Sequence, residues 1–193
     1  MSAHRTPHSR RASATLVLLL ILGACGQPGT DGTKGGFIAG DGTITRVAPA
    51  DRKPAPPISG NDLDGNPLSL AQFKGKVVVI NVWGSWCPPC RKETPALIAV
   101  ARSTKPLGVQ FLGIAIRENA VASKVFTDRM KVPYPSISND TGSLLLGFTK
   151  SLPAIAVPTT YVIDRHGRVA VRSMEPATVS TLTDIVTDIA NER

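Results

Sequence analysis

Apolar residues in this chain form two kinds of run, and the two kinds alternate along the sequence. Two runs are continuous and rich in Val and Ile, at residues 76–84 and 108–116, which is typical of strands buried on both faces of a sheet. Three others recur at helical spacing, at 88–103, 119–130 and 176–191. This alternation predicts an α/β sandwich.

Turn-forming residues predict shorter elements between these runs. Hairpins are expected at 35–49 around Gly-Asp-Gly, at 60–76 around Asp-Gly, and at 159–173 around His-Gly. A short strand is expected near Ile137 and a helix at 144–148. Because a closing hairpin adds antiparallel strands, the predicted sheet is mixed and flanked by helices.

The first 25 residues have the pattern of an export signal. A basic segment ends at Arg11, and an apolar stretch at 14–24 follows that is too short to span a bilayer as a stable helix. It runs into Leu-Gly-Ala-Cys, which resembles a bacterial lipobox, and the resemblance implies that Cys25 receives lipid. A plain secretory signal cut near Ala24 and an uncleaved anchor are the alternatives.

Three regions follow from this pattern: a lipoprotein signal peptide at 1–24, a tether with an N-terminal extension at 25–57, and a folded domain at 58–193. The segment after Cys25 is rich in Gly and polar residues, as flexible tethers are. A membrane-anchored protein outside the cytoplasm works in an oxidising setting, which bears on its cysteines.

Charge offers little support for a nucleic-acid partner. The chain has 22 basic and 14 acidic residues, a net charge of +8; removal of residues 1–24 leaves 19 basic residues and a net charge of +5. The basic residues are spread along the sequence, without a run and without interleaved aromatic residues. A mildly basic solvated surface is the simplest interpretation.

Cys87 and Cys90 carry the densest chemistry, in the stretch VWGSWCPPCRKETP. A structural zinc needs four ligands, and beyond this pair the mature chain offers only His166 and Cys25. A disulfide staple across so small a loop would stabilise the fold little. Redox exchange fits better, because Cys87 falls where a strand passes into a helix, whose N-terminus favours a thiolate. We expect Cys87 to be exposed there, with Trp86 shielding one side.

Several separated motifs resemble thioredoxin-fold proteins of the TlpA and ResA type. They are NVWGSWCPPCRKETP, FLGIAI and VPTTYVIDRHGRV, in the family's order and spacing over residues 58–193. The resemblance implies a thioredoxin-like sandwich, to which the hairpin at 35–49 is an N-terminal extension. Together with the lipobox, it is closest to ResA-type lipoproteins of actinobacteria.

The resemblance also implies roles for individual residues. Cys87 becomes the nucleophile and Cys90 the resolving thiol. Pro158 falls where the family has a cis-proline facing the disulfide, although most X-Pro bonds are trans. Trp86 and the residues that flank this proline, Val157 and Thr159, become substrate-binding.

Asn81 stands where thioredoxins bury an aspartate beneath the active site. Glu93, three residues after Cys90 on the same helical face, is the expected substitute, and ResA-like proteins carry a functional glutamate at this position. The alternative is that Glu93 only complements the helix dipole in the first turn.

The function implied is that of a membrane-tethered thiol-disulfide oxidoreductase, acting as a reductant outside the cytoplasm. Its substrate would be a protein disulfide, with apocytochrome c suggested, and its electrons would come from a membrane reductase of the CcdA type. The redox-active Cys87–Cys90 pair would be its only redox group, without a further cofactor. Alternatives are an oxidant of secreted thiols, a non-catalytic binding lipoprotein, and a thiol peroxidase, for which Gly84 stands where a Ser or Thr is needed.

Overall fold

The computed structural model describes residues 37–38, 44–154 and 156–192. The predicted signal peptide, Cys25, most of the tether, and the turn of the first hairpin lie outside these residues. Within them, no helix combines the length and the apolar character needed to cross a bilayer.

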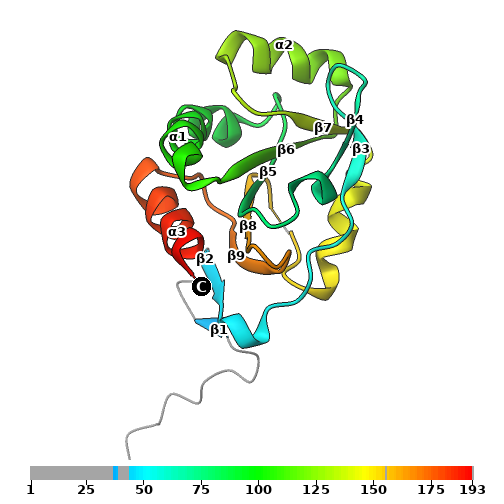
Figure 1. Ribbon diagram of the computed structural model, residues 1–193. Helices are drawn as coiled ribbons and strands as arrows, with labels where there is room; N and C mark the ends of the chain where they lie inside the picture. The colour runs from blue at the N-terminus through cyan, green and yellow to red at the C-terminus, as the bar shows by residue number, and fades with distance from the viewer. Residues whose placement is uncertain (1–36, 39–43, 155, 193) are drawn as a thin grey trace, which may run out of the picture. The chain divides into compact units, whose positions relative to one another are not determined.

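A seven-stranded mixed sheet forms the centre of the domain, in the order β1-β2-β9-β8-β5-β6-β7 (Figure 1). Its strands are β1 (Phe37–Ile38), β2 (Ile44–Val47), β5 (Val78–Trp83), β6 (Gln110–Ile116), β7 (Ser136–Asn139), β8 (Thr159–Ile163) and β9 (Val169–Ser173). Strands β5, β6 and β7 are parallel, whereas β8, β9, β2 and β1 continue antiparallel. A separate hairpin pairs β3 (Ser59–Asn61) with β4 (Pro67–Ser69). The α/β thioredoxin-like sandwich is thereby confirmed.

Helices cover both faces of this sheet. The α-helices are α1 (Pro88–Thr104), α2 (Ala120–Met130) and α3 (Val179–Asn191), and the 3-10 helices are η1 (Pro49–Asp51), η2 (Leu70–Phe73), η3 (Lys105–Leu107) and η4 (Ser143–Lys150). Figure 1 shows α1 and α3 side by side on one face, where their apolar residues share a core with Val77 and Val79. On the other face, η4 and the β3–β4 hairpin pack against Val78 and Ile80.

Strand β5 explains why its sequence is an unbroken apolar run. Alternate side chains point to opposite faces of a sheet. Here Val78, Ile80 and Val82 enter one core, while Val79 and Trp83 face the helices α1 and α2. Every residue of the strand is buried, which confirms the expectation for residues 76–84.

The sequence marks the helix starts with capping residues. Asn119 accepts a hydrogen bond from the Ala122 backbone N–H at the start of α2, and Thr178 accepts one from the Thr181 N–H at the start of α3. The helix expected at 144–148 is the 3-10 helix η4. It is framed by Gly142, whose φ of 71° only glycine adopts freely.

The N-terminal extension is tied to the domain by a buried ion pair. The Arg52 guanidinium is 3% exposed, donates to Asp164 Oδ2 at 3.2 Å, and holds the Glu192 carboxylate in a bidentate pair. Arg52 Nε also donates to the Val47 carbonyl. This cluster joins β2, the β8–β9 turn and the end of α3.

Candidate active site

The two cysteines form a disulfide at the N-terminus of α1. Their Cα atoms lie 5.3 Å apart, and the pair follows directly on the C-terminal end of β5. Cys87 is the N-cap of the helix, and its Sγ accepts a hydrogen bond from the Cys90 backbone N–H at 3.2 Å. Once the disulfide is reduced, this N–H and the positive end of the helix dipole would stabilise a Cys87 thiolate.

The expectation that Cys87 is exposed is wrong. Cys87 and Cys90 are each only 2% exposed. The Cys87 side chain turns inward over the first helical turn, and the Val157 segment covers it there, with the Val157 carbonyl oxygen 3.8 Å from Cys87 Sγ. Pro88 and Pro89 are nevertheless exposed.

The peptide bond between Val157 and Pro158 is cis, as the resemblance implies. It brings the Val157 carbonyl against the disulfide and leaves the Val157 side chain partly buried beside the cysteines. Thr159 is different, since its side chain is buried and its hydroxyl donates to the Ala156 carbonyl at 2.6 Å. The structure thus brings Val157 and Pro158 to the disulfide but does not place the Thr159 side chain at the surface.

Trp86 lies on the rim of the site. Its side chain is 43% exposed, and its indole N–H donates to the Ile116 carbonyl at 3.0 Å. The ring covers Gly84 so closely that a Cβ atom at that position would overlap it. There is accordingly no room at position 84 for the Ser or Thr that a peroxidatic cysteine requires.

Glu93 is buried on the inner side of α1, only 2% exposed. Its Oε1 accepts from the Asn81 side-chain amide at 2.9 Å, and its Oε2 accepts from the Ala177 backbone N–H at 2.8 Å. Burial raises the pKa of Glu93 from 4.5 to about 7, against the lowering effect of these two hydrogen bonds. A carboxyl that titrates near neutral pH one helical turn from Cys90 has the properties of a proton acceptor.

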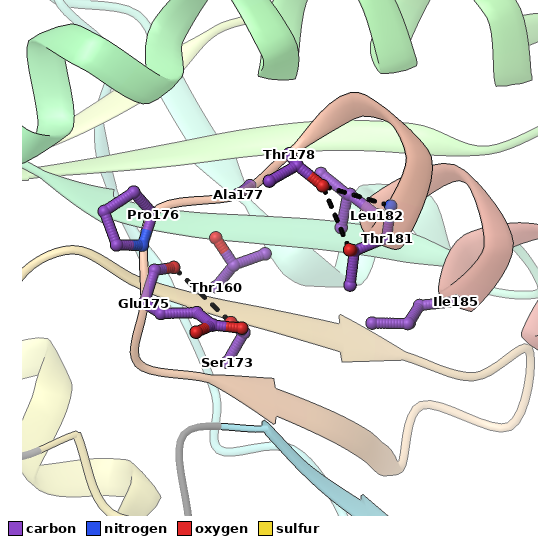
Figure 2. A pocket seen from close by; sticks show the side chains of 9 residues that line it. All are labelled: Thr160, Ser173, Glu175, Pro176, Ala177, Thr178, Thr181, Leu182 and Ile185. Atoms are coloured by element: carbon purple, nitrogen blue, oxygen red, sulfur yellow. Dashed lines mark hydrogen bonds between the residues drawn. The ribbon is translucent and has the colours of Figure 1, made fainter. Parts of the chain in front are cut away.

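Two residues that sequence reasoning missed complete this hydrogen-bonded group. Asn81 also donates to Thr160 Oγ1 at 3.2 Å. Thr160 and Ala177 both line a cavity of about 120 Å³ between β8, β9 and the start of α3 (Figure 2). The Ala177 segment that donates to Glu93 thus also borders this cavity. Thr160 is the last residue of the VPTT motif, but nothing in the sequence pairs it with Asn81.

A third missed residue holds the loop in front of Cys87. The Glu118 carboxylate accepts from the Ser85 backbone N–H at 2.8 Å, from the Ser85 hydroxyl, and from the Ser123 hydroxyl at 2.9 Å. The Ser85 carbonyl accepts from Arg91 at 2.9 Å. Ser85 is therefore fixed from two sides, although 33 residues separate it from Glu118.

Metal ligands do not gather in the part of the chain that the structure describes. No group of three or more His, Cys, Asp or Glu side chains is placed to hold an ion there.

A thioredoxin-like sheet whose helix begins with a disulfide, opposite a cis-proline, defines a thiol-disulfide oxidoreductase. The sequence profile of the Redoxin family matches residues 50–189, and the chain belongs to this family. It is 32% identical over 155 residues to the thiol-disulfide oxidoreductase ResA of Bacillus thuringiensis subsp. konkukian, covering 80% of this chain and 82% of that one.

Solved structures agree with this assignment. A secreted thiol-disulfide isomerase from Corynebacterium glutamicum superposes with a TM-score of 0.74 at 28% identity, over 80% of this chain and 96% of that chain. A DsbF homologue from Corynebacterium diphtheriae gives a TM-score of 0.72 at 30% identity, over 77% of this chain and 94% of that chain. The chain is thus a ResA/TlpA-like thiol-disulfide oxidoreductase.

Proposed function

We propose that this protein is a membrane-tethered reductant of protein disulfides outside the cytoplasm. The observation that carries the proposal is the buried Glu93 carboxyl, held by Asn81 and Ala177 behind the Cys87–Cys90 disulfide. An extracytoplasmic location is supported by the apolar stretch at 14–24 and by the relative that is described as secreted. The resemblance of Leu-Gly-Ala-Cys to a lipobox supports an anchor at Cys25.

The reaction exchanges two electrons. The Cys87 thiolate attacks one sulfur of a substrate disulfide, which forms a mixed disulfide and releases the first substrate thiolate. Cys90 then transfers its proton to Glu93 and attacks Cys87 Sγ. The second substrate thiolate leaves, the substrate is now a dithiol, and the Cys87–Cys90 disulfide is formed. Glu93 gives its proton to solvent before the next cycle.

Apocytochrome c is the proposed substrate. Its haem-attachment CxxCH motif must be a dithiol before haem can be joined, so a reductant is needed in an oxidising compartment. The protein must itself be reduced after each turnover, and we assign this to a membrane thiol reductase of the CcdA type. Its own redox group is the cysteine pair.

Trapping tests the substrate assignment directly. A Cys90→Ala variant retains the nucleophile but cannot resolve the mixed disulfide, so it should accumulate covalently bound substrate. Cys87→Ser is the matched control and should trap nothing. Recovery of apocytochrome c peptides joined through Cys87 is the expected result. Recovery of only unrelated secreted proteins would overturn the substrate assignment, and the absence of any adduct would overturn the reductase mechanism.

Oxidation of secreted thiols is a second candidate, favoured by the hydrogen bond from the Cys90 N–H to Cys87 Sγ. A thiolate stabilised at a helix N-terminus makes the corresponding disulfide a stronger oxidant. The reduction potential decides between the two directions. A reductant should lie near or below the value of about −270 mV of thioredoxin, whereas a value near about −120 mV would assign the oxidant role.

A further inference from the structure

The fold gathers basic residues that are scattered in the sequence. At the end of the sheet where β5 begins, six exposed Lys and Arg side chains come from four separate segments. They are Lys53, Lys74, Lys76, Arg102, Lys105 and Arg165. The topology places them together at the edge of the sheet where β5 and β6 start. Helix α1 ends at this edge and continues into η3, and the antiparallel strand β8 also ends there. We call this set the basic end.

Acidic side chains do not neutralise the basic end. Asp164 and Glu192 lie nearby but are occupied by Arg52, and Asp164 also by Arg168. Asp51, two residues before Lys53, is an exposed acidic residue at this end. Within the described ranges, none of the six basic side chains has an ion-pair partner. The basic end therefore carries an excess of positive charge.

A hollow of about 320 Å³ lies within the basic end. Its apolar walls include Leu70 and Phe73, while Lys74, Lys76 and Arg165 line it with cationic groups. The Asp164 carboxylate also lines it, but its charge is offset by the ion pairs with Arg52 and Arg168. Apolar walls beneath cationic side chains match the chemistry of a phospholipid, whose phosphate is bonded to a glycerol and acyl chains.

The chain also enters the domain at this end. Phe37 in β1 lies opposite Val47 in β2, and Val47 leads directly into the segment that carries Lys53. The eleven residues between Cys25 and Phe37 reach at most about 40 Å. Cys87, by contrast, lies beyond the other end of β5, a strand about 20 Å long.

We propose that the basic end rests on a bilayer containing anionic phospholipids, so that the Cys87–Cys90 site faces away from the membrane. This inference rests on the membrane tethering in the proposed function. Each Lys or Arg close to an anionic surface strengthens binding about fivefold, and the tether keeps the domain within reach. In this orientation the site would meet disulfides of soluble domains, and the domain must turn on its tether for the membrane thiol reductase to re-reduce the Cys87–Cys90 pair.

Hydrogen–deuterium exchange of the full chain reconstituted into vesicles tests the orientation. On phosphatidylcholine vesicles that contain phosphatidylglycerol, amides at 73–77 and 165–168 should exchange more slowly than on phosphatidylcholine alone. Amides around Trp86 should not change between the two vesicles. Single changes Lys74→Glu and Lys76→Glu should each reduce the added protection. Lys92→Glu, an exposed lysine at the opposite end of α1, is the matched control and should not.

Other outcomes overturn the proposal. Equal exchange on both vesicles, or protection centred on Trp86, would contradict the orientation. Protection of 73–77 by inorganic phosphate without vesicles would assign the hollow to a free anion instead of a lipid. Insulin disulfide reduction on the same vesicles reports the catalytic function separately, so failure of the orientation leaves that function measurable.

Discussion

The side-chain amide of Asn81 donates to Glu93 Oε1 at 2.9 Å and thereby joins the centre of β5 to the inner face of α1. An amide has both a donor and an acceptor. Rotation of the amide would let Asn81 donate to an ionised Glu93 and accept from a protonated one, and the Thr160 hydroxyl can adapt to either. An aspartate at position 81 would instead place two carboxyl groups in contact, and one of them would be forced to hold a proton.

Glu93→Gln should remove a step from the pH profile of catalysis. In the unaltered protein, Glu93 becomes able to accept the Cys90 proton as the pH rises through its pKa of about 7. Glutamine accepts no proton, so resolution of the mixed disulfide should slow at least about tenfold at pH 7.5 and recover only toward the ordinary thiol pKa of about 8.5. Single-turnover rates between pH 5 and 9 measure this.

Glu175→Gln is the control for that experiment, since Glu175 lines the neighbouring cavity without contacting Asn81 or Glu93 in the described hydrogen bonds. Its profile should match that of the unaltered protein. If Glu93→Gln retained the inflection near pH 7, the proton would be passing to another group.

Stability should also depend on Glu93, with the sign set by its raised pKa. Between pH 4.5 and about 7, the folded protein keeps the proton that the unfolded chain has lost, so the folded state binds more protons. The contribution of Glu93 is fully present below pH 4.5 and is lost as the pH rises through about 7, by an amount on the order of 3 kcal/mol. Urea unfolding at pH 5 and pH 8 should show this loss relative to Glu93→Gln. An unchanged difference between the two proteins at both pH values would contradict it.

Much of the fold could be predicted from local patterns. A few neighbouring residues are enough to identify the Val-rich strand β5 and the helix caps Asn119 and Thr178. The three-residue spacing of Cys90 and Glu93 likewise places both on one face of the helix. The residues that contact this face depend on the tertiary structure and cannot be inferred locally. The Ala177 N–H that donates to Glu93, for example, lies 84 residues away in the sequence. The exposure of Cys87 was mispredicted for the same reason, because a helix tip is open only if no neighbouring segment covers it.

Glu118 should act as a positioning residue for the active-site loop. Glu118→Ala leaves the Ser85 N–H and the Ser123 hydroxyl without their acceptor, which should destabilise the protein by about 2 kcal/mol and slow insulin reduction about tenfold through displacement of Trp86 and Cys87. Glu118→Gln retains an acceptor for both donors and should keep most of the activity. If both variants lost activity equally, the role of Glu118 would be its charge rather than its hydrogen bonds.

Arg52→Met should destabilise the protein by about 3 kcal/mol, because it leaves a buried carboxylate short of a partner. Asp164 would keep its hydrogen bonds to Arg168. The expected loss of stability is therefore at the lower end of the range for broken buried ion pairs. Arg46→Met removes the exposed pair with Asp188 and should cost less than about 1 kcal/mol. Urea unfolding of the two variants compares them directly. Because Cys87 lies at the other end of β5, the reduction potential of Arg52→Met should remain that of the unaltered protein, and a shift would show that the N-terminal extension acts on the active site.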